Sequence, residues 1–134
     1  MTHTKHKFKY TYIDDNKFLR PYILITLKNN EKTLPVLALV DSGADFSMFD
    51  GELANILDID LTKLQKIDLS GINGTAQGHV AHIEIGVENS FIHVPAVFSF
   101  DFSPNGFGGV IGQMGFFDNY VVVFDRANKR LLLK

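Results

Sequence analysis

The residues best suited to chemistry are the tripeptide Asp41-Ser42-Gly43, which directly follows an apolar segment from Leu34 to Val40. An apolar run of this length predicts a buried strand, so the Asp41 carboxylate is expected where that strand ends in a turn. This position is unusual for a carboxylate, because the preceding residues lie inside the protein. Carboxylates act as general acids and bases, and the chain has no Cys that could serve as a thiolate nucleophile. Acid–base chemistry at Asp41 is therefore the first hypothesis.

A purely structural explanation covers the same three residues. Asp, Ser and Gly are among the commonest turn residues, and a tight turn after a strand often uses them. Taken alone, the tripeptide favours this explanation, so the wider sequence has to decide between a simple turn and an acid–base centre.

Two other groups of residues invite a chemical interpretation. His79 and His82, with His93 nearby in sequence, suggest zinc, but strand residues three apart point to opposite faces. No Cys or well-spaced carboxylate completes a tetrahedral set, so we expect no metal and no cofactor. The Gly-rich segment 103–109 lacks the Gly-Lys-Ser/Thr sequence of a phosphate-binding loop.

The elements that must position Asp41 follow the two-residue period of β-strands. We expect strands over 22–27, 34–40, 91–100 and 110–112, two strands between 64 and 85 around a tip at 70–75, and a final hairpin over 120–133. The continuous apolarity of 34–40 predicts burial on both faces. The Phe residues of 98–117 are expected mainly in the core, with a substrate cleft as the alternative place for Phe102 and Phe107, which flank a Gly-rich loop. Short helices are expected after Asp50, as the capping residue, and over 113–119. Many short strands with one or two short helices predict an all-β fold, either a closed barrel or a sandwich.

Length and charge narrow the functional classes. A chain of 134 residues is one domain long, and 13 Lys and Arg against 15 Asp and Glu leave a net charge of −2. This balance argues against a nucleic-acid partner, which would select a basic surface. The sequence has neither the apolar core of a secretory signal nor an apolar run of about 18 residues. We therefore expect a cytoplasmic protein with no membrane partner.

The wider sequence favours the chemical explanation. Residues 37–45, Leu-Ala-Leu-Val-Asp-Ser-Gly-Ala-Asp, resemble the active-site loop of the aspartic proteases. The parts that follow come in a similar order: a helix, a Gly-containing hairpin similar to a flap, and the triplet Val110-Ile111-Gly112 before a short helix and a final hairpin. The pattern occurs twice in pepsins and once in retropepsins, the retroviral-type proteases, and it occurs once here. From about residue 22 to residue 133 the chain resembles a cellular retropepsin-like protease, which implies the closed all-β barrel of that family.

The resemblance implies an aspartic endopeptidase. Peptide hydrolysis without a metal or a covalent intermediate needs one group to deprotonate water and another to protonate the carbonyl oxygen. Two carboxylates about 3 Å apart supply both, because they share one proton. Asp41 is the only candidate in the chain, so the second carboxylate is expected from Asp41 of another subunit in a two-fold homodimer. Ser42 is expected to lock the two loops together, and Gly43 to let the backbone approach the carboxylate.

The resemblance also implies where a peptide or protein substrate binds. The substrate is expected in extended conformation, paired like a strand between the cleft and the flaps. Contacts are expected from Ala44, Asp45, Gly71, Ile72, Asn73, Gly74, Val110 and Ile111, of which the last two also pack behind the catalytic loop. The sequence departs from the viral pattern at Gln113, which replaces an Arg that pairs with the counterpart of Asp45, and in the flap, which has one Gly fewer.

Two expectations complete the interpretation. Residues 1–20 are expected to form an N-terminal extension or edge strand, and residues 21–134 the protease domain. The alternative function is a dimeric peptide-binding or assembly module on the same fold, with weak or no hydrolysis. The intact Asp-Ser-Gly favours the enzyme, because a buried pair of like charges costs stability and would serve no purpose in a module that only binds.

Overall fold

The computed structural model describes residues 6–9, 11–12, 18–71, 74–102 and 108–134 of the chain. Most of these residues lie in strands, and the fold is all-β, as the sequence predicts. Across these ranges, none of the helices has the length and apolarity needed to cross a lipid bilayer.

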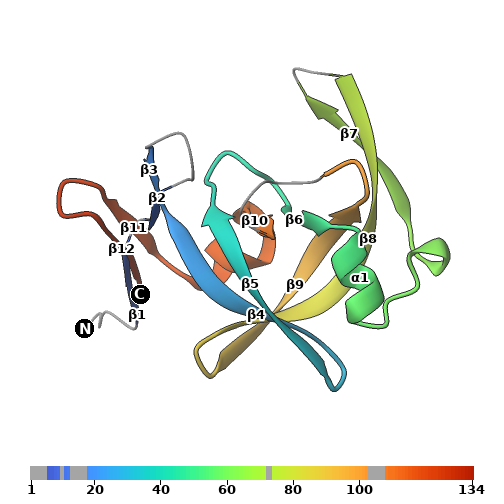
Figure 1. The fold of residues 1–134 in the computed structure, drawn as a ribbon, viewed down its shortest axis with the longest axis horizontal. Coiled ribbons are helices and arrows are strands. Elements are labelled where there is room, and N and C mark those ends of the chain that lie inside the picture. The colour runs from blue at the N-terminus through green and yellow to red at the C-terminus, as the bar shows by residue number, and fades with distance from the viewer. Residues whose placement is uncertain (1–5, 10, 13–17, 72–73, 103–107) are drawn as a thin grey trace.

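A closed barrel of six strands forms the body of the molecule (Figure 1). In the order in which they pair, the strands are β4 (Tyr22–Asn29), β5 (Lys32–Val40), β10 (Gly109–Ile111), β6 (Ser47–Asp50), β9 (Ser90–Ser99) and β8 (Gly74–Val87). The barrel closes where β8 pairs with β4, with Thr26 opposite Gly86. Strand β7 (Lys66–Gly71) pairs only with β8, and the two form a hairpin that projects beyond the barrel in Figure 1.

Alternate side chains of the barrel strands fill its interior. Val36, Ala38 and Val40 of β5 are buried, whereas Leu37 and Leu39 between them are only half-buried. The expected burial of this strand on both faces is therefore wrong, because β5 belongs to a single-walled barrel with one face inward. The aromatic core is built around Phe49 of β6 and Phe98 of β9, whose ring centroids lie 5.7 Å apart.

The expected core position of Phe100 is also wrong. Strand β9 ends at Ser99, and Phe100 lies in the turn that follows with 55% of its surface exposed. Its ring covers Gly51, where an added Cβ would lie 2.8 Å from the ring. Phe107 lies outside the described residues.

Within the described part of the chain, three short helical segments cover the barrel. They are α1 (Glu52–Ile56), the turn η1 (Leu61–Lys63) and the turn η2 (Gln113–Phe117). Asp50, the expected cap of the first helix, accepts a hydrogen bond from the Glu52 N–H at 3.0 Å, although Gly51 stands at the capping position itself. The second expected helix is not regular, because Met114 and Gly115 leave helical backbone angles and Gly115 has φ of 85°.

A second, smaller sheet brings the two ends of the chain together. Its order is β1 (His6–Lys9), β12 (Arg130–Leu133), β11 (Val122–Asp125), all antiparallel. A short pair, β2 (Thr11–Tyr12) with β3 (Leu19–Arg20), leads from β1 into the barrel. Strand β1, the first of the described strands, thus pairs with β12, the last one.

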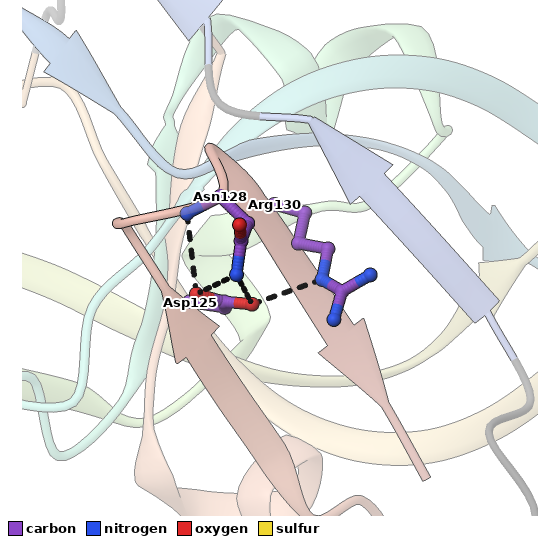
Figure 2. A network of polar contacts seen from close by, with 3 residues as sticks. All are labelled: Asp125, Asn128 and Arg130. Atoms are coloured by element: carbon purple, nitrogen blue, oxygen red, sulfur yellow. Dashed lines mark hydrogen bonds and ion pairs between the residues drawn. The ribbon is translucent and has the colours of Figure 1, made fainter.

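The turn between β11 and β12 is held by one carboxylate (Figure 2). Asp125 accepts hydrogen bonds from the Asn128 side chain at 2.9 Å and from the Nε of Arg130 at 2.9 Å. The Asn128 hydrogen bond, and after it the Arg130 guanidinium, lowers the pKa of Asp125 below its ordinary value. Arg126 in the same turn donates to the Leu19 carbonyl at 2.6 Å, which ties the hairpin to β3.

Candidate active site

Asp41 lies directly after β5, where two parallel strands end side by side. Val40 is opposite Ile111 in the parallel pair of β5 and β10. The Asp41 N–H donates to the Ile111 carbonyl at 2.9 Å. Strand β5, which ends directly before Asp41, is part of the barrel wall. The packing of the barrel core therefore fixes where the Cα of Asp41 lies.

The carboxylate of Asp41 is oriented by its own turn. Oδ1 accepts a hydrogen bond from the Gly43 N–H at 2.9 Å, and the Ala44 N–H donates to the Asp41 carbonyl at 3.2 Å. A Cβ on residue 43 would lie only 3.2 Å from Oδ1, so glycine permits this close approach. Asp41 itself is half-buried, whereas Ser42 and Gly43 are exposed. The turn thus presents one held carboxylate at the surface of the barrel.

A buried serine supports the loop from below. The Oγ of Ser47, which is fully buried, accepts a hydrogen bond from the Gly112 N–H at 3.1 Å. A Cβ on Gly112 would lie 2.5 Å from the Phe46 carbonyl oxygen and 2.7 Å from that of Ala44. Only glycine fits there, which explains the third residue of the Val-Ile-Gly triplet.

Gln113 holds the loop through both its main chain and its side chain. Its N–H donates to the Ala44 carbonyl at 2.8 Å, and its Nε2 donates to the Ser42 carbonyl at 2.8 Å. The next N–H, of Met114, donates to the Asp45 carbonyl at 2.8 Å. The sequence placed no supporting role on Gln113 or Ser47. The only sequence feature that could have pointed to them is their polarity. Gln113 directly follows the Val-Ile-Gly triplet, and Ser47 precedes the apolar residues Met48 and Phe49.

A cavity of about 370 Å³ opens beside the Asp41 loop. Its lining comes from the loop, from β6 and from the projecting strand β7: Gly43, Ala44, Asp45, Phe46, Met48, Ile67, Asp68 and Leu69. The wall is mainly apolar, with one carboxylate on each side. Asp41 itself is not part of the lining, but Gly43, whose N–H donates to the Asp41 carboxylate, is.

The predicted site residues lie in three places: the Asp41 loop, the β7–β8 hairpin and strand β10. Ala44 and Asp45 line the cavity, and the main chains of Gly71 and Gly74 pair at the end of the projecting hairpin. Ile72 and Asn73 lie outside the described residues. Val110 is half-buried and Ile111 fully buried, and both lie behind the loop, outside the cavity lining.

The three histidines considered as zinc ligands lie on β8 and β9, on the barrel wall. His93 is opposite Glu84, with its Nε2 3.9 Å from the carboxylate, and His82 is opposite Pro95. Among the residues that the structure describes, no three His, Cys, Asp or Glu side chains gather into a group that could hold a metal ion.

Comparison with known proteins gives one family and a set of structural neighbours. A family model described as aspartyl protease matches residues 25–114. The fold is similar to the crystal structure of a retropepsin-like aspartic protease from Rickettsia conorii, with a TM-score of 0.65 and 18% identity over 96% of this chain and 98% of that one. It is also similar to the EIAV protease complexed with the inhibitor HBY-793, with a TM-score of 0.55 and 19% identity over 77% of this chain and 88% of that one. A sequence comparison with curated proteins gave no match.

Proposed function

This chain belongs to the aspartyl protease family, and we propose that it is a homodimeric aspartic endopeptidase whose two Asp41 side chains, one from each subunit, activate a single water. The observation that carries the proposal is the Asp41 carboxylate, held by Gly43 on a loop that the barrel core fixes beside an open cavity. The retropepsin-like fold agrees with it.

The proposed mechanism follows from the electrostatics of two close carboxylates. Two such groups about 3 Å apart cannot both ionise, so the pair carries one shared proton. The ionised carboxylate removes a proton from water, the resulting oxygen attacks the peptide carbonyl carbon, and the protonated carboxyl donates to the carbonyl oxygen. Collapse of the tetrahedral intermediate breaks the C–N bond, and a proton passes to the leaving amine. No covalent enzyme intermediate is required.

The proposed mechanism needs two close carboxylates, so a second copy of the chain has to supply the other one. The loop carries one held carboxylate, and Asp45, the other acidic residue of the loop, is exposed on the cavity wall. A two-fold axis beside the loop would place a second Asp41 next to the first. Ser42 is exposed next to Asp41, so its hydroxyl is free to contact the partner loop.

The outer edge of β11 offers a surface for that second copy. Val121 exchanges both main-chain hydrogen bonds with Lys134 at 3.0 Å, so the alternation of an antiparallel ladder turns the main-chain groups of Val122 and Phe124 outward. Val121 and Phe124 are 61% and 42% exposed. Edge strands usually carry charges that prevent pairing, but residues 121–124 are Val-Val-Val-Phe. This apolar edge supports pairing with a second chain.

The cavity supports a peptide substrate in extended conformation. Strand β7 forms one wall, and an extended peptide could lie between it and the loop, with apolar side chains against Met48, Ile67 and Leu69. Main-chain recognition of this kind gives affinity, and pockets for alternate side chains give specificity. The cytoplasmic location and the absence of a nucleic-acid partner stay predictions from the sequence.

The proposal is tested by Asp41→Asn, with Asp58→Asn as a control at an exposed carboxylate outside the cavity lining. The measurement is turnover of a peptide library from pH 3 to pH 8 and the thermal midpoint of each protein. We expect Asp41→Asn to abolish hydrolysis and to keep or raise the midpoint, because Asn retains the shape and removes like-charge repulsion. The wild-type profile should be bell-shaped, since either full protonation or full ionisation of the pair stops the reaction.

Retained turnover in Asp41→Asn would overturn the assignment of Asp41. A folded, dimeric wild-type protein that binds library peptides and hydrolyses none would favour the peptide-binding module instead.

A further inference from the structure

We propose that Ser99 and Asp101 are positioning residues that set the angle at which the β7–β8 hairpin leaves the barrel, and through it the shape of the substrate cavity. This inference rests on the proposed function for its effect on catalysis. Its structural part concerns only how the hairpin is held.

The two residues act where β8 loses its partner strand. The β8–β9 ladder ends at the pair His79–Phe98, and β9 turns away after Ser99. Main-chain groups of successive strand residues face opposite sides. The Val80 N–H faces away from β9 and donates to the Gln65 carbonyl at 3.0 Å. Counting from Val80, Gln77 is therefore the first residue beyond the ladder whose main chain faces β9. Because β9 has turned away, the N–H and C=O of Gln77 have no strand to pair with.

Side chains replace the missing strand. Asp101 Oδ2 accepts a hydrogen bond from the Gln77 N–H at 2.9 Å, and the Ser99 hydroxyl donates to the Gln77 carbonyl at 2.5 Å. The Ser99 Oγ also accepts from the Asp101 N–H at 3.1 Å, which links the two residues. Ser99 is 1% exposed, and it is one of two buried polar side chains among the described residues. Both main-chain groups of Gln77 are therefore clamped to the end of β9.

The clamp is one strand away from the cavity. Gln77 lies directly opposite Asp68 in the β7–β8 pair, and its Nε2 lies 3.4 Å from Asp68 Oδ1. Asp68, with Ile67 and Leu69 on either side, forms the β7 wall of the cavity. Among the described residues, the hairpin from Gln77 toward its tip pairs only with itself, so the clamp joins β8 to the barrel at the level of the wall. A change of angle there would move the wall relative to Ala44 and Asp45.

The first test measures the hairpin without any substrate. Amide hydrogen exchange is followed by NMR in wild type, Asp101→Ala, Asp101→Asn and the control Asp60→Ala. Asp60 is also an exposed carboxylate that accepts a backbone N–H, from Thr62 at 3.0 Å, but it lies at η1 away from the hairpin. We expect about tenfold faster exchange at Leu69 and Ala76 in Asp101→Ala, as loss of one charge-assisted hydrogen bond allows. Asp101→Asn, which keeps an acceptor oxygen, should restore slow exchange, and Asp60→Ala should leave it unchanged.

The second test measures peptide hydrolysis by the same four proteins. Asp101→Ala should raise KM by about tenfold and change kcat much less, because the wall binds substrate and the Asp41 pair is untouched. Asp101→Asn should return KM toward the wild-type value. Unchanged exchange at Leu69 and Ala76 in Asp101→Ala would overturn the clamp. Faster exchange with an unchanged KM would overturn its link to the cavity. A wild-type protein without hydrolysis would instead refute the proposed function, and the exchange data would still decide the clamp.

Discussion

At the scale of single residues, the candidate site depends on how firmly the Asp41 loop is held. Four hydrogen bonds join this loop to Ile111, Gln113 and Met114, at the end of the neighbouring strand β10 and just after it. A catalytic carboxylate must stay within a fraction of an ångström of its productive position. Residues that only support the loop should therefore affect catalysis more than stability.

Gln113 allows this to be measured. In Gln113→Ala the Ser42 carbonyl loses its side-chain donor, while the main-chain bonds of residue 113 remain. Because the lost bond is exposed, we expect a stability loss of about 0.5–1.5 kcal/mol but a fall of roughly tenfold in kcat/KM. Gln113→Glu should be at least as damaging, since a carboxylate would then face the carbonyl oxygen.

The matched control is Gln65→Ala, at an exposed glutamine outside the cavity lining, which should leave both quantities near wild type. If the fall in kcat/KM of Gln113→Ala were no larger than the loss of folded protein that its lower stability causes, a supporting role for this side chain in catalysis would be excluded.

The same scale shows what the sequence can and cannot reveal about the site. Asp41 could be named as the candidate, because the apolar strand before it and the order of the motifs after it outweigh the simpler explanation of a turn. Ser47 and Gln113 could not be named, because their contacts join residues 65 and 71 positions apart. Such contacts exist only once the barrel is closed. A polar side chain in sequence gives no sign of the backbone group it will meet.

At the scale of elements, the long strands, the hairpins and the short helix after Asp50 were predictable, whereas strand β6 and the shape of η2 were not. β8 and β9 alternate clearly enough to be recognised, and the turn between them follows. β6 was missed because its four residues show no period, and its strand conformation comes from pairing with β9 and β10. η2 was expected as a helix, but Gly115 at φ of 85° breaks it so that the chain can reach β11.

The β11–β12 hairpin carries a prediction on pH. The hydrogen bonds shown in Figure 2, that of Asn128 first, lower the pKa of Asp125 in the folded protein. A carboxylate whose pKa is lower in the folded than in the unfolded protein stabilises the fold at pH values above its unfolded-state pKa of about 3.9. This stabilisation is lost as the pH falls from that value through the folded-state pKa. Asp125→Asn should therefore lower the thermal midpoint by a constant few degrees at most from pH 5 to 8. The difference from wild type should shrink below about pH 4.

Thermal unfolding of both proteins at each pH gives the measurement. Asp60→Asn is a useful companion, because the hydrogen bonds of Thr62 also lower the pKa of Asp60. A gap between wild type and Asp125→Asn that widened toward low pH would show that the sign of this linkage is wrong.

At the scale of the whole molecule, the closed barrel explains why the Asp41 loop is anchored on the barrel and why the β7–β8 hairpin projects from it. Strand pairing closes the circle from β4 round to β8 and leaves β7 outside it. The fold class was predictable from the number of short strands and the order of the motifs. In the three-stranded sheet the β11–β12 hairpin was also expected, but the pairing of β1 with β12 was not, because strands so far apart in sequence leave no local pattern. That sheet exposes the β11 edge that we propose joins a second copy.

The central claim is that two Asp41 side chains from different chains act on one peptide bond, and subunit mixing tests it most directly. Wild-type chains are mixed with an equal amount of Asp41→Asn chains, and exchange by dilution or brief denaturation is verified with a mass-tagged chain. Random pairing leaves about one quarter of the dimers with both aspartates.

The account predicts that activity per wild-type chain falls to about half of that in a control with no variant, at matched total chain concentration. Full activity per wild-type chain after verified exchange would contradict it, because each chain would then carry a complete site of its own.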